Sequence, residues 1–154
     1  MVIKKKLKKF WKNKKVLITG HTGFKGSWMS ILLNILEAEI YGYSLKPNKK
    51  SLFNQANCKS FLKKNFYGNI KNLKDLENKI KKSKPSILFH LAAQPLVSES
   101  FADPLETFNT NILGTANVLY AARKISSIKS IVIITTDKVY KIKNSNRKYN
   151  ELDE

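Results

Sequence analysis

Residues 14–36 read KKVLITGHTGFKGSWMSILLNIL, and they combine a short apolar run, a glycine-rich turn and a helix-length segment. Val16, Leu17 and Ile18 are contiguous apolar residues, which is typical of a strand covered on both faces. The segment from 24 to 36 predicts a helix with one apolar side, formed by Trp28, Ile31, Leu32 and Ile35. The stretch therefore predicts a strand, a tight turn and a helix in that order.

The turn, TGHTGFKG at residues 19–26, carries three glycines with separate physical uses. Gly20 permits a tight turn, Gly23 lets a ligand approach the backbone, and Gly26 allows close packing of helix on strand. The helix N-terminus behind such a turn presents N–H donors to phosphates. A structural glycine turn is the alternative. The residues expected to cradle the pyrophosphate of a dinucleotide are Gly20, Thr22, Gly23, Phe24, Lys25 and Gly26.

The residue that would contact the ribose of the cofactor can be interpreted in two ways. An acidic residue about 20 positions after the turn usually binds the 2′-hydroxyl of NAD. Lys46 stands near that position, where it could pair with the 2′-phosphate of NADP or be a solvated loop lysine.

The rest of the chain alternates short apolar runs with helix-length stretches, which is typical of βαβ units. Asp103 and Pro104 supply an N-cap and a first-turn proline for the last helix. The predicted strands are 39–44, 66–67, 86–93 and 130–136, and the predicted helices are 73–80 and 104 to about 124. The sequence thus predicts an α/β fold, a Rossmann-type doubly wound parallel sheet over residues 14–154, after a basic lead-in at 1–13.

Composition narrows the function classes. The formal net charge of +18 could indicate nucleic-acid binding, but the cations are almost all lysine and are scattered, so compositional drift is the favoured explanation. The lead-in could lie on a membrane as an amphipathic segment, and a solvated lead-in is favoured. No apolar run is long enough to span a bilayer, and the lone Cys58 fits a reducing cytoplasm. We expect no metal, no nucleic acid and no membrane partner.

Several further stretches resemble the extended short-chain dehydrogenase/reductase family, and within it the sugar-nucleotide dehydratases that act on CDP-glucose. The stretches are FW at 10–11, VLITGHTGFKGSW at 16–28, IYGYSL at 40–45, SLF at 51–53, HLAAQPLV at 90–97, DPLETFNTNILGT at 103–115 and TTDKVY at 135–140. The resemblance implies a 4,6-dehydratase in which bound NAD takes hydride from sugar C4, water leaves across C5 and C6, and hydride returns to C6. It also implies a homodimer in the full-length form.

The resemblance assigns roles at the end of the last predicted strand. Thr136 would bond the 4-oxygen of the sugar, Asp137 would protonate the departing 6-hydroxyl, and Lys138 would remove the C5 proton. The alternative for these three residues is a polar strand end with an Asx turn.

The resemblance also places other residues beside the cofactor. Ala92, Ala93 and Gln94 would line the nicotinamide side, with ordinary tight packing as the alternative, and Asn111 would brace the site. Two further residues, Asn69 and Ile70, would lie beside the adenine. His90, in an apolar strand, is expected to be a hydrogen-bonded core residue rather than a ligand.

The family's Tyr-x-x-x-Lys pair is expected beyond residue 154, together with the last sheet element and the lobe that holds the sugar. The pairs Tyr67 with Lys71 and Tyr120 with Lys124 have the right spacing but precede the fifth strand, so we interpret them as chance matches. On this interpretation the chain is an amino-terminal portion of such an enzyme.

Overall fold

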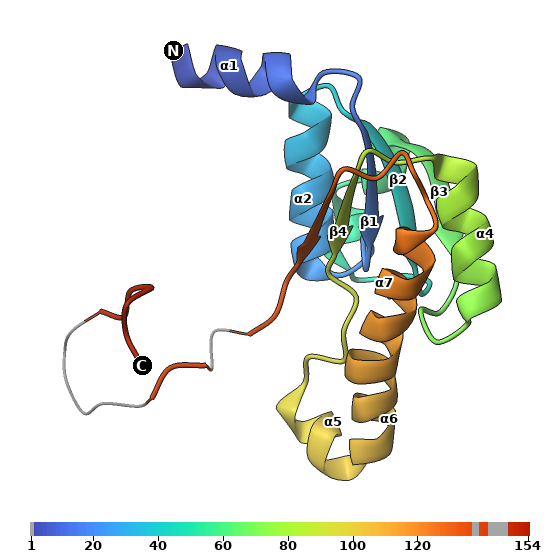
Figure 1. The fold of residues 1–154 in the computed structure, drawn as a ribbon, viewed down its shortest axis with the longest axis vertical. Helices are drawn as coiled ribbons and strands as arrows, with labels where there is room; N and C mark the ends of the chain where they lie inside the picture. The colour runs from blue at the N-terminus through green and yellow to red at the C-terminus, as the bar shows by residue number, and fades with distance from the viewer. Residues whose placement is uncertain (1, 137–138, 142–147) are drawn as a thin grey trace.

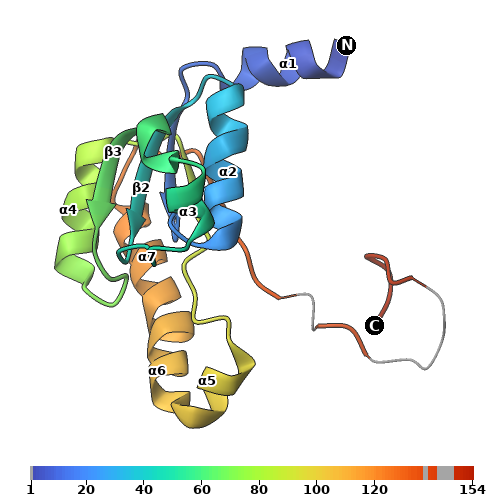
Figure 2. The same cartoon turned by 180° about the vertical axis from the view of Figure 1, so that it is seen from behind.

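The computed structural model describes residues 2–136, 139–141 and 148–154 (Figure 1). A single sheet of parallel strands lies between helices (Figures 1 and 2). The elements are, in order, α1 (Val2–Trp11), β1 (Lys15–Thr19), α2 (Phe24–Ile35), β2 (Glu39–Ser44), α3 (Leu52–Gln55), η1 (Cys58–Phe61), β3 (Leu62–Tyr67), α4 (Leu73–Ser83), β4 (Ile87–His90), α5 (Val97–Ala102), α6 (Pro104–Phe108), η2 (Asn109–Leu113), α7 (Gly114–Arg123) and β5 (Ser130–Ile133).

The strand order is β3-β2-β1-β4-β5, and every neighbouring pair is parallel. From β1 the chain moves outward to β2 and β3, then crosses back to β4 on the other side of β1. This reversal between β1 and β4 is the topological switch point, where doubly wound sheets bind their ligands at the carboxyl ends of the strands. The predicted α/β fold with a Rossmann-type sheet is confirmed.

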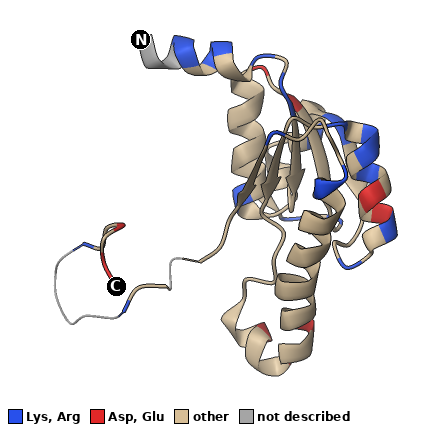
Figure 3. Ribbon diagram, viewed as in Figure 1, with Lys and Arg blue, Asp and Glu red and all other residues tan. Residues whose placement is uncertain are grey.

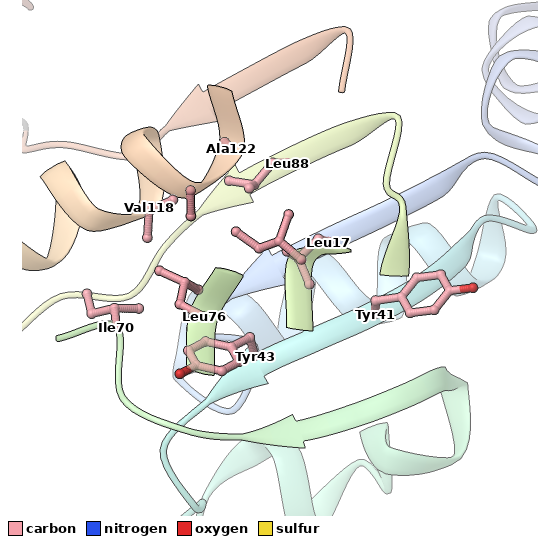
Figure 4. Packing of buried hydrophobic residues seen from close by; sticks show 10 residues of the cluster. Leu17, Tyr41, Tyr43, Ile70, Leu76, Leu88, Val118 and Ala122 are labelled. Carbon is pink, nitrogen blue, oxygen red and sulfur yellow. The ribbon is translucent and has the colours of Figure 1, made fainter. Parts of the chain in front are cut away.

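Two apolar layers hold the helices on the sheet. On one face, Leu17 of β1 and Tyr43 of β2 pack against α4 and α7 through residues such as Leu76 and Val118 (Figure 4). On the other face, Val16 and Ile18 pack against α2. Because side chains alternate along a strand, contiguous apolar residues in β1 supply both layers at once.

Helix α2 turns an unexpected side to the sheet. Its buried residues are Gly26, Ser27, Ser30 and Leu33. The predicted apolar side is instead largely open, with Trp28, Leu32 and Ile35 each more than half exposed. Small residues bring the helix close to the sheet, and the two serine hydroxyls are satisfied by the carbonyls four residues earlier. The apolar spacing therefore located the helix but not its buried face.

The predicted helix from residue 104 to about 124 is a run of three segments, α6, η2 and α7. It begins as expected, because Asp103 accepts a hydrogen bond from the Glu106 amide at 2.9 Å and Pro104 occupies the first turn. The run passes through one π-helical segment, η2, before it continues as α7. Among the described residues no helix is both long and apolar enough to cross a membrane.

Other boundaries moved by a few residues, and four elements were not predicted. Strand β3 begins at Leu62, four residues before the predicted start, and its first half was missed because Lys63 and Lys64 interrupt the apolar pattern of this edge strand. Strands β4 and β5 are shorter than predicted, and α4 is longer. The elements absent from the prediction are the lead-in helix α1, α3, η1 and α5.

Candidate functional site: the turn after β1

The glycine turn lies at the switch point, beside the segment that leaves β4. Gly20 follows β1 with φ of 75°, a left-handed conformation that favours glycine. A Cβ built on Gly20 would lie 2.6 Å from the Ala92 backbone nitrogen. A glycine is therefore required at position 20 for two reasons: the left-handed backbone of the turn, and the close approach of the segment that follows β4.

The two later glycines let the start of α2 pack closely against the Gly20 backbone. A Cβ on Gly26 would collide with the carbonyl oxygen of Gly20, and one on Gly23 would lie 3.3 Å from the same oxygen. Gly23 is the N-cap of α2 and offers no side-chain cap. The amides of the first turn thus keep donor capacity and the positive end of the helix dipole for an anion. This arrangement fits a pyrophosphate.

Thr22 ties the turn to the end of β2. Its hydroxyl donates to the Leu45 carbonyl at 3.0 Å and lies 2.7 Å from the Ser44 hydroxyl. Since a threonine hydroxyl has one proton, the Ser44 hydroxyl donates to Thr22. Both hydroxyls are therefore engaged in holding the turn rather than free for a ligand.

His21 anchors the turn from beneath. The ring is fully buried, and its Nε2 lies 2.8 Å from Oδ1 of Asn65 in β3, so Nε2 carries the proton. Its Nδ1 then has a lone pair without a hydrogen-bond partner. Burial lowers the pKa of His21 to about 4, against the opposing effect of the Asn65 hydrogen bond. The turn thus rests on a neutral imidazole.

The imidazole needs a glycine in β2. A Cβ on Gly42 would lie 2.5 Å from the His21 ring. Sequence reasoning placed His21 in the turn but missed Gly42 and Asn65 as its partners. A glycine inside an apolar strand is the signal that could have found this contact, since such a glycine often marks a close approach.

A hydrogen-bonded chain crosses the switch point. The Thr115 hydroxyl donates to the Asn111 carbonyl at 2.7 Å, so Nε2 of His90 must donate to Thr115 at 2.9 Å. Nδ1 of His90 then accepts from the Thr19 hydroxyl at 2.6 Å. Desolvation lowers the pKa of His90. The expectation of a hydrogen-bonded core histidine is confirmed.

Asn111 continues this chain to the loop after β4. Its side chain forms two hydrogen bonds with the Gln94 backbone, accepting from the amide at 2.8 Å and donating to the carbonyl at 3.0 Å. The Gln94 side chain in turn contacts Thr107 and the Leu96 backbone. Ala92 and Gln94 are half-buried, whereas Ala93 is exposed. These contacts fix the loop that faces the glycine turn.

Asn69 and Ile70 follow β3 on the other side of the turn. Oδ1 of Asn69 accepts from the Lys71 amide, and the Asn69 carbonyl accepts from the Tyr43 hydroxyl. Ile70 is 4% exposed, and a Cβ on Gly114 would lie 2.5 Å from its side chain. The Ile70 side chain is thus part of the core, and its carbonyl already accepts a hydrogen bond from the Asn117 side chain at 3.1 Å.

The remaining predicted residues lie on the rim or beyond the described part. Phe24, Lys25 and Lys46 are exposed, the first two in the opening turn of α2 and the third after β2. Thr136 is exposed beyond β5. The other two predicted catalytic residues, Asp137 and Lys138, lie outside the described residues.

A metal site and the Tyr120–Lys124 pair can be examined within the described residues. Among the residues that the structure describes, no three His, Cys, Asp or Glu side chains group closely enough to hold a metal ion. Tyr120 and Lys124 sit together in the second half of α7, where Lys124 pairs with Glu77 at 2.7 Å. That end of α7 leads into the start of β5 and so lies away from the glycine turn.

Comparisons with known proteins agree with this geometry. Residues 17–150 match the family model described as GDP-mannose 4,6 dehydratase. The chain is 43% identical over 134 residues to CDP-glucose 4,6-dehydratase of Salmonella typhimurium, with 86% of this chain and 37% of that protein covered. It is 32% identical to UDP-glucose 4-epimerase of Rickettsia bellii, with 84% of this chain and 39% of that protein covered.

Solved structures give the same fold. The crystal structure of Pal from Bacillus thuringiensis matches with a TM-score of 0.77 and 25% identity, covering 90% of this chain and 44% of that one. UDP-glucose-4-epimerase from Stenotrophomonas maltophila, solved with bound NAD and formylated UDP-arabinopyranose, matches with a TM-score of 0.72 and 20% identity, covering 87% and 40%. The chain thus spans well under half the length of these relatives. The chain belongs to the GDP-mannose 4,6-dehydratase family of extended short-chain dehydrogenases/reductases.

Proposed function

We propose that this chain binds NAD and forms the cofactor portion of a nucleotide-sugar 4,6-dehydratase that acts on CDP-glucose. The main observation behind the proposal is the turn from Gly20 to Gly26, where a Cβ on Gly20 or Gly26 would clash with backbone and the following helix has no side-chain cap. The 43% identity to CDP-glucose 4,6-dehydratase supports the substrate.

In this proposal, different residues around the turn contact different parts of NAD. Amides of Phe24, Lys25 and Gly26 hold the pyrophosphate, since the Gly23 amide donates to the Gly20 carbonyl within the turn, and the exposed Lys25 side chain adds positive charge at the rim. The backbone from Ala92 to Gln94, fixed by Asn111, supports the nicotinamide side. Asn69 and the Ile70 backbone lie toward the adenine. When bound, NAD supplies the acceptor and donor of hydride.

The substrate chemistry falls to the residues that follow β5 in the sequence. Thr136 donates a hydrogen bond to the 4-oxygen, Asp137 protonates the departing 6-hydroxyl, and Lys138 accepts the C5 proton. A lysine has an ordinary pKa near 10.4, so this role needs a pKa lowered by burial or by neighbouring cations. These roles rest on the TTDKVY resemblance, and a single buried Cys58 fits the reducing cytoplasm in which we place the enzyme.

Sugar epimerisation is the second candidate reaction. It is favoured by the 32% identity to UDP-glucose 4-epimerase. A third possibility is a dinucleotide-binding module without chemistry of its own. The three differ in what they do to a nucleotide sugar.

One experiment separates them. The purified chain is titrated with NAD by calorimetry and then incubated with NAD and either CDP-glucose or UDP-glucose, with products followed by proton NMR. A 4-keto-6-deoxy product from CDP-glucose supports the dehydratase, and a C4 epimer without loss of water supports the epimerase. Binding without any product supports the inert module, and no binding at all overturns the proposal.

We also propose that the arm formed by α5, α6 and η2 pairs with a second copy. Its apolar residues Phe101, Leu105, Phe108 and Ile112 are 57 to 84% exposed, an unusual density for a free surface. Leu105→Lys should shift sedimentation toward the monomer, whereas Asn78→Lys, which makes the same change in charge at an exposed position of α4 outside the arm, should not. A monomeric parent protein at high concentration contradicts this pairing.

A further inference from the structure

We infer that α1, together with the lysine-rich amino end of the sheet, is a docking surface for an anionic phospholipid membrane. Helix α1 extends from the domain at the end where the strands begin (Figures 1 and 2). Every side chain from Lys5 to Phe10 is exposed, including Leu7 at 46% and Phe10 at 53%. Leu7 and Phe10 thus expose apolar surface on this helix, and the Lys14 ammonium lies 4.7 Å from the centroid of the Phe10 ring.

The helix is fixed to the domain at its base. The Trp11 ring lies 6.1 Å from the Phe89 ring in β4, and Trp11 packs against the apolar layer beneath α2. Phe10 meets Trp11 edge to face, with ring centroids 5.0 Å apart. Leu7 and Phe10 are three positions apart, so they share one side of the helix. The exposed pair is therefore held in a defined position rather than on a loose tail.

Positive charge covers the side of α1 away from Leu7 and Phe10. A groove of about 680 Å³ beside α1 is lined by Lys5, Lys6, Lys8, Lys9, Lys12 and Glu37. Glu37 pairs with Lys8 at 2.7 Å and Lys12 at 3.3 Å, and these lysines lower its pKa. The other lysines of the groove add uncompensated charge.

The same charge continues along the amino end of the sheet. Exposed lysines stand within three residues of the starts of β1, β3, β4 and β5, at positions 15, 63, 84 and 129. Lys81 and Lys82 add to them at the end of α4, and Figure 3 shows blue segments at this end of the molecule. The apolar pair thus sits at the margin of a broad basic surface.

Lipid fits this combination better than nucleic acid. A basic helix with an apolar side that includes an aromatic ring inserts that side among acyl chains while its lysines meet anionic headgroups. Nucleic-acid recognition uses arginine for bidentate contacts, and here the cations are lysines with long, snorkelling side chains. The lead-in was expected to be solvated, and its folding into an anchored helix is what changes that interpretation.

The position of the surface leaves the glycine turn open. Helix α1 precedes β1 at Lys15, whereas Gly20 follows the opposite, carboxyl end of the same strand. A membrane bound at the amino end therefore faces away from the turn. Vesicle binding should leave nucleotide binding unchanged, and the two can be measured separately.

The test is flotation of the whole chain with vesicles of phosphatidylcholine alone or with about 30% phosphatidylglycerol. We expect flotation only with the anionic vesicles, and its loss at about 500 mM salt, where headgroup charge is screened. Equal flotation with neutral vesicles, or none with either, overturns the proposal. So does tighter binding to a DNA duplex of the same charge density than to the vesicles.

Charge-matched variants locate the surface. Lys5→Glu with Lys9→Glu should weaken partitioning at least tenfold, because each lysine near an anionic surface contributes roughly fivefold. Lys49→Glu with Lys50→Glu makes the same change in net charge at exposed positions after β2 and should have a much smaller effect. Leu7→Asp with Phe10→Asp should also abolish flotation while circular dichroism stays unchanged. Equal losses from the two charge variants would overturn the assignment to α1.

Discussion

A Cβ on Gly20 would lie 2.6 Å from the Ala92 backbone nitrogen, although the two residues are 72 positions apart in the sequence. The turn after β1 and the exit from β4 are thus built against each other. Gly20→Ala should lower the free energy of unfolding by about 1–3 kcal/mol, because it adds both a left-handed non-glycine residue and a clash with backbone. It should also weaken NAD binding at least tenfold. Chemical denaturation and calorimetry measure the two effects.

Gly23→Ala is the matched variant with which the stability loss of Gly20→Ala should be compared. Its φ is −75° and its added Cβ would lie 3.3 Å from the Gly20 oxygen, so a small adjustment accommodates it. Its stability loss should therefore be smaller than that of Gly20→Ala. If both variants were as stable as the parent protein, the close contact between Gly20 and the Ala92 backbone would be contradicted.

The buried imidazole of His21 predicts a pH dependence of stability. Its pKa is about 4 in the folded chain and 6.5 when unperturbed, so the unfolded chain binds more protons between these values. Stability contributed by neutral His21 is fully present above the unfolded pKa and is lost as pH falls toward 4. Between about pH 7.5 and about pH 5.5 the free energy of unfolding should fall by about 1.4 kcal/mol from this residue.

The matched variant for this prediction is His21→Gln, which keeps an amide donor for Asn65 but has no ionisable group. The parent and the variant are unfolded in urea at both pH values. The parent should lose more stability than the variant on acidification. Parallel losses in the two proteins would show that His21 is not the group responsible.

Asn111 is predicted to act by positioning the loop after β4. Asn111→Ala removes the hydrogen-bond partners of the part-buried Gln94 amide and carbonyl. This loss should lower the free energy of unfolding by about 1–3 kcal/mol. NAD affinity should fall more than the affinity for ADP, since the loop faces the nicotinamide half in our proposal. Asn109→Ala, an exposed neighbour on η2, serves as the control. An unchanged NAD-to-ADP affinity ratio would contradict the positioning role.

We predict that Lys46 influences the preference between NAD and NADP. It is exposed directly after Leu45, at the position from which a side chain can reach the ribose 2′ substituent. Lys46→Glu should raise the ratio of the NADP Kd to the NAD Kd by about tenfold, because a carboxylate repels the 2′-phosphate and accepts from the 2′-hydroxyl. Lys49→Glu should leave the ratio near its original value. If both variants behave alike, Lys46 is a solvated loop residue.

The sequence predicts the sheet well, because the rules that govern it are local. Contiguous apolar residues located β1, and Asp103 with Pro104 located the start of α6. The spacing of its three glycines located the turn, because each glycine occupies a position where a side chain would interfere with the turn or with the packing of the helix.

What escaped prediction depends on contacts distant in the chain. The partnership of His21 with Gly42 and Asn65 joins three elements, and nothing in their sequence neighbourhoods specifies it. The buried side of α2 was missed because small residues, not large apolar ones, face the sheet. Helix α1 was missed because its lysines suggested a solvated segment, and its anchor, Trp11 on Phe89, is a tertiary contact.

We propose that the backbone from Gly20 to Gly26 holds the diphosphate of NAD. The amide spectrum of the ¹⁵N-labelled chain during a titration with NAD tests this contact. We predict that the largest shift changes fall on Phe24, Lys25 and Gly26, the first-turn amides of α2, and that inorganic pyrophosphate moves the same signals. A folded chain whose first-turn amides stay in place at saturating NAD would contradict it.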